Sequence, residues 1–254
     1  MIQIDRAKLF ASLHVKGDPL ILFNIWDPGS ARAVSEAGTK AIATGSWSVA
    51  AANGLDDGED VPLDLVLANA KRIVAAVDLP VTIDFEGGYG KTPEAVAENI
   101  RRLLATGAVG CNFEDQIVGG DGLCSIDDQC ARIKAIRRAA EQAGVPFFIN
   151  ARTDLFLKAD PAQHGDHLQE ALLRAQAYER AGASGFFAPG LAQSDLIRQL
   201  CEQSPLPVNI MIMPDTPSPR ELAALGVARI SHGPGPYRQM AASLTAAAQQ
   251  AFKN

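Results

Sequence analysis

The sequence predicts an α/β protein folded as a (β/α)8 barrel, or TIM barrel, and three observations support this prediction. Eight short apolar segments alternate with segments of helical periodicity, at the spacing of one βα unit. The apolar segments do not alternate with polar residues, which is typical of parallel strands buried on both faces. No G-x-G-x-x-G pattern follows the first of them, which argues against an open dinucleotide-binding sheet. We therefore interpret residues 1–254 as one barrel domain.

The expected strands are the apolar runs that end in glycine, proline or polar residues. They cover residues 20–26, 40–44, 81–86, 110–115, 146–150, 185–188, 207–213 and 228–232. In a barrel the carboxyl ends of all these strands meet at one mouth, and barrel enzymes place their active sites there.

Helices are expected where apolar residues recur at helical spacing. They cover residues 4–13, 30–37, 63–77, 93–107, 126–144, 167–180, 195–201, 219–225 and 237–252. Thr92 and Ser125 are expected to cap two of these helices at their start. The glycine-rich segment 116–125 is expected to be a mobile lid.

Composition excludes several classes of function. The net charge of -6 gives no support to a nucleic-acid-binding surface. Four cysteines are scattered without a C-x-x-C pair, so neither structural zinc nor a disulfide framework is expected. The start of the chain lacks the pattern of a signal peptide, and no apolar run approaches the ~18 residues of a membrane span. A cytoplasmic protein without a membrane partner is expected.

The stretch from Pro80 to Gly90 carries the clearest sign of a site. Asp84 and Glu86 lie two positions apart at the end of the expected strand 81–86, where such side chains point the same way. Two acids on one face repel each other unless a cation lies between them, and hard oxygen ligands suit Mg²⁺ or Mn²⁺. The alternative is a strand end that runs into a polar turn.

Further polar residues lie at the other expected strand ends and should gather at the same mouth. Glu114 would join Asp84 and Glu86 in a partial Mg²⁺ shell. Arg152 offers a fork of donors that suits a carboxylate or phosphonate. The other candidates are Asp27, Gly45, Ser46, Asp115, Asn209 and His232.

Each candidate also has a purely structural interpretation, which stays open. Asp27 could shape a turn, and Asp115 could cap the loop that follows it. Asn209 could satisfy a buried backbone group, and His232 could form a hydrogen bond at the barrel rim. Arg152 could simply pair with Glu114 or Asp154. The convergence of all these residues on one mouth favours a site that polarises an oxyacid and stabilises negative charge beside it.

Three motifs then resemble the isocitrate lyase/phosphoenolpyruvate mutase superfamily. They are Asp84-Phe-Glu-Gly-Gly-Tyr-Gly90, Asn112-Phe-Glu-Asp-Gln116 and Asn150-Ala-Arg-Thr-Asp154. The resemblance covers nearly the whole chain and implies a (β/α)8 barrel that binds Mg²⁺ and a 2-oxo acid or its enolate. It also implies cleavage or formation of a C–C or C–P bond beside that enolate.

The resemblance assigns roles by motif. It implies metal-ligand places for Asp84, Glu86 and Glu114, and a place in the metal shell through water for Asp57. It implies that backbone amides hold the substrate carboxylate at Gly45, Ser46 and Trp47, and that Arg152 binds substrate. Asp27 and Asn209 complete the expected substrate site, and Glu114, Arg152 and His232 form the expected catalytic set.

The sequence also departs from that family. Glu86 stands where the family often has aspartate, and its extra methylene would shift a ligand by about 1 Å or make it act through water. The loop after Gln116 lacks the family's lysine and histidine, and no cation beside Cys124 is visible that would lower its pKa. Met211 and Met213 stand where tricarboxylate lyases have hydroxyl side chains. These departures argue against isocitrate, 2-methylisocitrate and the mutase reaction.

The sequence therefore predicts a Mg²⁺-dependent lyase that cleaves a C–C bond in a small 2-oxo or 2-hydroxy acid, like an oxaloacetate decarboxylase. His232 or a metal-bound water would deliver the proton to the enolate. The alternatives are a phosphonopyruvate-type C–P bond enzyme and a non-catalytic 2-oxo-acid binder. A homo-oligomer is expected, because members of the family form dimers and tetramers, often by exchanging the last helix.

Overall fold

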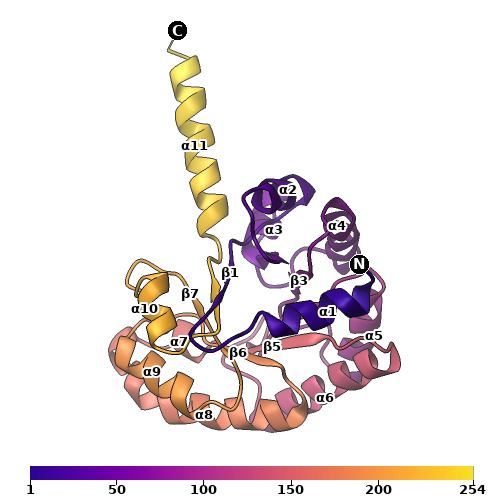
Figure 1. The fold of residues 1–254 in the computed structure, drawn as a ribbon, viewed down its shortest axis with the longest axis vertical. Coiled ribbons are helices and arrows are strands. Elements are labelled where there is room, and N and C mark those ends of the chain that lie inside the picture. The colour runs from indigo at the N-terminus through magenta and orange to yellow at the C-terminus, as the bar shows by residue number, and fades with distance from the viewer. Residues whose placement is uncertain (254) are drawn as a thin grey trace.

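Eight parallel strands form a nearly closed barrel in the computed structural model, which describes residues 1–253 (Figure 1). The strands are β1 (Leu20–Leu22), β2 (Ile42–Ala43), β3 (Val81–Asp84), β4 (Gly110–Glu114), β5 (Phe148–Arg152), β6 (Gly185–Phe187), β7 (Val208–Met211) and β8 (Arg229–Ser231). Their order is β1-β8-β7-β6-β5-β4-β3-β2. Just beyond β1 and β2, a parallel bridge between Ile25 and Thr44 joins the two ends of this order. The predicted (β/α)8 barrel is confirmed.

Helices surround the strands on the outside of the barrel (Figure 1). They are α1 (Gln3–Ser12), α2 (Pro28–Glu36), α3 (Ser46–Ala52), α4 (Leu63–Ala76), α5 (Pro93–Leu104), α6 (Ile126–Gln142), α7 (Leu155–Lys158), α8 (His164–Ala181), α9 (Ser194–Gln203), α10 (Pro219–Ala224) and α11 (Gly235–Ala251), with a 3-10 turn η1 (Pro161–Gln163). The side chains of Thr92 and Ser125 cap α5 and α6 as predicted. The short helices α3 and α7 were not expected, because 7 and 4 residues are too few to show helical periodicity.

The strand that carries Asp84 is shorter than predicted. β3 ends at Asp84, and Glu86 has a φ of 47°, in the left-handed region. The carboxylate of Glu86 turns away and accepts hydrogen bonds from the amides of Gly58 and Glu59 at 2.8 and 2.7 Å. Two charge-assisted bonds of this kind offset the strain of the backbone. The prediction that Asp84 and Glu86 lie side by side on one strand is therefore wrong.

The last helix, α11, leaves the barrel and projects away from it (Figure 1). Among its residues Pro236 alone is buried. Beside its base, Ile21 and Phe23 at β1 are 46% and 41% exposed. None of the helices in residues 1–253 has the length and apolar character to cross a membrane.

Candidate active site

A cavity of about 150 Å³ lies at the carboxyl ends of the strands. Residues from the first five strands and their loops form its polar side, and residues from β6, β7 and the loops after β5 and β8 form its apolar side. Predicted site residues on its wall are Gly45, Ser46, Trp47, Asp57, Asp84 and Arg152. The mouth therefore collects a large part of the set that the sequence predicted.

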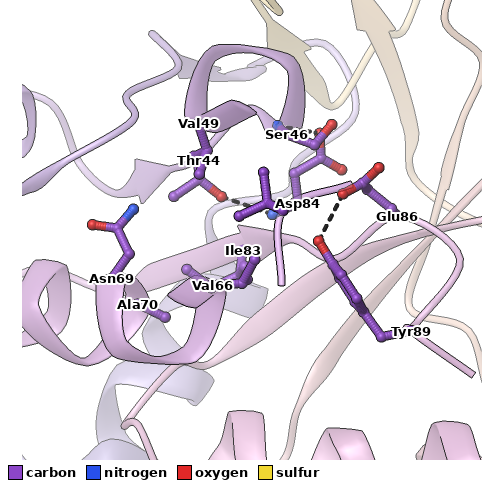
Figure 2. A pocket seen from close by; sticks show the side chains of 11 residues that line it. Thr44, Ser46, Val49, Val66, Asn69, Ala70, Ile83, Asp84, Glu86 and Tyr89 are labelled. Carbon is purple, nitrogen blue, oxygen red and sulfur yellow. Dashed lines mark hydrogen bonds between the residues drawn. The ribbon is translucent and has the colours of Figure 1, made fainter. Parts of the chain in front are cut away.

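The carboxylate of Asp84 differs from the other groups of this cavity in the hydrogen bonding of its two oxygens. Its Oδ2 accepts a hydrogen bond from the amide of Ser46 at 3.0 Å, and its own amide donates to Thr44 Oγ1 at 2.8 Å (Figure 2). Its Oδ1 is buried and has no hydrogen-bond partner within residues 1–253. Because a buried charged oxygen without a partner is costly, this atom fits a site made for a cation.

Glu86 is close by, but its oxygens are already in use. Tyr89 donates to its Oε1 at 2.8 Å (Figure 2), and the two loop amides donate to its Oε2. Burial raises the pKa of Glu86 to about 7 against the effect of the Tyr89 hydrogen bond, and the neighbouring Asp57 and Asp84 raise it further. A metal ion at Asp84 would meet Glu86 through water.

Asp57 and Glu114 are two further carboxyl groups near Asp84, and both are close to other charged groups. Burial, and then the charge of Asp84, raise the pKa of Asp57. Burial also raises the pKa of Glu114, although its Oε2 lies 3.0 Å from Arg152 Nη1. In residues 1–253, no three histidine, cysteine or acidic side chains are arranged as a ready metal site. Of these acids in residues 1–253, only Asp84 has a buried oxygen without a hydrogen-bond partner.

Arg152 lies across the cavity and is shared between two acids. Its Nε and Nη2 donate to the two oxygens of Asp154 at 2.6 and 2.9 Å, while Nη1 faces Glu114. Burial opposes its charge, but these two carboxylates raise the pKa of Arg152 above its ordinary value. The pairing that was open as an alternative is thus present, and the guanidinium still lines the cavity as a permanent cation.

Four predicted substrate or catalytic residues do not line this cavity: Glu114, described above, and Asp27, Asn209 and His232. Asp27 caps α2, and its Oδ1 accepts the amide of the third helical residue at 2.7 Å. Asn209 lies inside the barrel and exchanges hydrogen bonds with Ser231. The ring of His232 packs against Phe23 with 5.1 Å between centroids, and burial lowers its pKa. His232 therefore lies against Phe23, just after the end of β8.

Asp115 anchors the loop that was predicted to be a lid. It is fully buried, and its Oδ2 lies 3.1 Å from Arg174 Nη1, which also donates to the carbonyl of Cys124 at 3.1 Å. Both ends of the loop are thus tied to one guanidinium. Between them an antiparallel bridge pairs Gln116 with Leu123.

The expectation that no cation lies beside Cys124 is wrong. Arg132 Nη1 is 3.4 Å from its sulfur, because the first turns of α6 bring Arg132 back toward the loop. The guanidinium also donates to the carbonyls of Gly87 and Gly90 and lies over the ring of Phe113. These contacts join the loops after β3 and β4.

Sequence reasoning missed the neutral part of the wall. Asn24 ties β1 to the end of β8, since its Oδ1 accepts the amides of His232 and Gly233, both at 2.9 Å. Phe187 and Leu157 line the cavity on the apolar side. The available signal was that Asn24 and Phe187 fall within expected strands near their carboxyl ends.

Comparison with known proteins agrees with this geometry. The family model described as phosphoenolpyruvate phosphomutase matches residues 10–252. A crystal structure from Burkholderia cenocepacia J2315, provisionally described as a phosphonomutase, is 52% identical, with a TM-score of 0.96 over 98% of this chain and 99% of that one. The 2-methylisocitrate lyase of Escherichia coli K12 is 31% identical over 83% of this chain and 71% of its own length. An oxaloacetate decarboxylase of Pseudomonas entomophila is 25% identical over 90% and 78% of the two chains.

The matched residues span the whole barrel, including every strand end described above. The chain belongs to the phosphoenolpyruvate mutase family, within the isocitrate lyase/phosphoenolpyruvate mutase superfamily. Members of this superfamily are lyases and mutases, so the chain belongs among enzymes.

Proposed function

We propose that this protein is a Mg²⁺-dependent lyase that cleaves a C–C bond next to a small 2-oxo or 2-hydroxy acid through an enolate, in the manner of an oxaloacetate decarboxylase. The observation that carries the proposal is the partnerless, buried Oδ1 of Asp84 in a cavity that also holds Arg152. A cation would give Asp84 Oδ1 a partner, and Arg152, although paired with Asp154 and Glu114, adds a positive charge on the same cavity wall for an oxyacid.

The residues fit a hard divalent cation, Mg²⁺ or Mn²⁺. Asp84 would contact it, and Asp57, Glu86 and Glu114 would hold its water ligands. When bound, the ion supplies Lewis-acid polarisation of the oxygen at C2 and offsets charge that develops there. Its positive charge would also favour the ionised form of these carboxyls, whose pKa is raised first by burial and further by neighbouring acids.

The chain's own residues orient the acid. Arg152 presents a fixed guanidinium to the carboxylate, held in place by Asp154. The amides of Gly45 and Ser46 donate to Ile25 O and Asp84 Oδ2, so the start of α3 positions Asp84 as well as lining the substrate space. This fixed polar surface would favour the enolate over the ground state.

The test is turnover of a panel of 2-oxo and 2-hydroxy acids that includes oxaloacetate, with and without EDTA. We expect release of the 2-oxo product that EDTA abolishes and Mg²⁺ restores. Oxalate binding without turnover of any acid would instead support a non-catalytic binder. Turnover that is unchanged by EDTA would contradict the metal requirement.

A C–P bond enzyme is the second candidate, because the 52% identical structure from Burkholderia cenocepacia is provisionally described as a phosphonomutase. Phosphonopyruvate in the same panel distinguishes the two. Inorganic phosphate or phosphoenolpyruvate as a product would favour C–P chemistry over C–C cleavage.

We further propose a homo-oligomer built through α11. The helix has an exposed apolar face that includes Leu244 (66% exposed) and Met240 (37%), and Ile21 on β1 and Phe23 just after it are also exposed. The α11 of a second copy would cover that surface. Light scattering at micromolar concentration should give a multimeric mass that Leu244→Glu lowers, whereas a monomeric mass for the unmodified protein would contradict the proposal.

A further inference from the structure

The apolar side of the cavity is a continuous wall. Phe187 and Pro189, at and after the end of β6, are buried, and Met211 ends β7. Leu157 of α7 and Pro234 before α11 complete the wall. Carbon and sulfur atoms therefore face the polar side that carries Asp84 and Arg152.

Two glycines hold this wall in place. Gly233 has a φ of 53°, and a Cβ there would lie 2.5 Å from Met211 Sδ, so the backbone after β8 packs directly on this side chain. Gly190 has a φ of 92°, and a Cβ there would lie 2.6 Å from the carbonyl oxygen of Phe156, next to Leu157. The wall is thus part of the packed structure of the barrel rim.

No basic side chain of residues 1–253 lines the apolar side of the cavity. Among residues 1–253, Arg152 is the one basic residue on the cavity wall, and its three donor nitrogens already face Asp154 and Glu114. Ser231 is engaged with Asn209. The lid segment 116–125 contains no lysine, arginine or histidine, so its closure over the cavity would bring no positive charge.

We propose that Met211, Leu157 and Phe187 form a subsite for an uncharged fragment of the substrate. This inference rests on the proposed function and specifies its substrate class. The acid would carry one lasting anionic group, its 2-oxo or 2-hydroxy carboxylate, held on the polar side. The group beyond C3 would be alkyl, or would leave as a neutral molecule.

Decarboxylation meets this condition. The C3–C4 bond breaks, its electron pair stays on the 2-oxo fragment as the enolate, and the C4 carboxylate leaves as neutral CO₂. A proton from solvent then adds to C3. Because the charge beside the apolar wall disappears in this step, the wall disfavours the ground state more than the transition state. A phosphonate, or a second carboxylate that is not released, would keep its charge beside the apolar wall throughout the reaction.

The test compares two stable acids of similar shape, malate and 2-hydroxy-4-methylpentanoate, in which an isopropyl group replaces the second carboxylate. Their competition with oxalate is measured by calorimetry in the presence of Mg²⁺. We expect the branched acid to bind at least about tenfold more tightly than malate, because the site cannot pair the second carboxylate. Met211→Lys should reverse this preference.

Met213→Lys is the matched control. It adds the same charge two residues further along the chain, at a side chain that does not line the cavity, and it should leave the preference unchanged. Oxalate has no group beyond its two carboxyls and reports the polar side alone. Oxalate binding with malate equal to or tighter than the branched acid overturns the subsite, whether or not Met211→Lys folds. Failure of oxalate itself to bind overturns the proposed function.

Discussion

The two ends of the barrel both bury ionisable groups, but of opposite charge and with different surroundings. At the mouth, Asp57, Asp84 and Arg152 line the cavity, Glu114 pairs with Arg152, and Glu86 neighbours Asp57 and Asp84. At the bottom, where the strands begin, Arg229 is buried, and His14, just after α1, is partly buried. The mouth therefore gathers acidic groups, and the bottom holds a buried guanidinium beside an imidazole.

The bottom is packed rather than open. Arg229 is 1% exposed, donates to Asn112 Oδ1 at 3.0 Å and has two nitrogens without a partner. His14 stacks on Phe148 with 4.0 Å between ring centroids. Aromatic rings enclose both groups, and Phe10 lies edge-on to His14 and Phe148.

The difference between the two ends of the barrel shows that a buried charge without a partner indicates a ligand only where it adjoins a cavity. At the mouth the partnerless oxygen of Asp84 adjoins space that a cation and a small acid could fill. At the bottom, burial lowers the pKa of Arg229 to about 9. The desolvation of this guanidinium lowers the stability of the folded state. In our proposal the first charge serves a bound cation, whereas the second is enclosed by the packed barrel.

The largest expected effect is at Asp84. Asp84→Asn should abolish Mg²⁺-dependent oxalate binding and lower kcat/KM by about 10³-fold or more, because metal-ion catalysis supplies several kcal/mol. Without metal the same variant should be more stable to urea, because it removes one of the crowded charges. Asp78→Asn, at a fully exposed acid, is the control. It should leave oxalate binding, kcat/KM and stability to urea unchanged. Unaltered oxalate binding in Asp84→Asn would remove the metal assignment.

Arg152 should matter more than His232. Arg152→Lys keeps the charge but loses the fork that binds Asp154, so kcat/KM should fall by about 10²-fold or more. His232→Gln should cost less than the ~10²-fold of a positioned proton donor, since its ring packs on Phe23 outside the cavity. Steady-state kinetics on the acid that the panel identifies would measure both. A more damaged histidine variant would mean that these roles are reversed.

At the mouth, stability should fall as the pH rises. Burial raises the pKa of Glu86 from 4.5 to about 7, so the folded state holds a proton that the unfolded state releases between these values. By linkage this costs up to about 3 kcal/mol across that window. Glu86→Gln should flatten the loss in metal-free urea titrations between pH 4.5 and 7. An equal slope in the variant and the unmodified protein would contradict the assignment.

At the bottom, the sign is opposite. Burial, followed by the charge of Arg229, lowers the pKa of His14 from 6.5 to about 3. The unfolded state gains a proton below pH 6.5 that the folded state does not, so stability falls by about 2 kcal/mol from pH 6.5 to 5. His14→Phe keeps the aromatic packing and should remove this slope. His167→Phe on α8 should retain it, and a slope that persists in His14→Phe would locate the titration elsewhere.

The smallest effect is expected in the loop 116–125. Its glycines Gly119 and Gly122 have φ values of 70° and 82°, while the guanidinium of Arg174 fixes its base. Oxalate with Mg²⁺ should slow amide hydrogen exchange in this loop several-fold and leave α11 unchanged. Identical exchange with and without the ligand would argue against a lid.

Much of the fold and part of the site follow from sequence patterns. The alternation of apolar runs and helical periods predicts the barrel, because each βα unit is a local feature of roughly 30 residues. Capping at Thr92 and Ser125 is equally local. The strand-end rule then brings Asp84, Glu114 and Arg152 to one mouth, since parallel strands in a barrel end on the same face.

Other features depend on contacts between distant segments, and only the tertiary structure decides them. Glu86 leaves the line of β3 because amides 27 and 28 residues away offer it hydrogen bonds. His232 faces outward, toward Phe23, because the direction of a strand side chain depends on the register of its neighbours. The pairing of β7 with β8 and a close glycine contact place Met211 on the cavity wall, and a second glycine contact places Leu157 there. The sequence by itself determined the barrel and the acids of its mouth, and packing between remote loops decided which side of that mouth is left without charge.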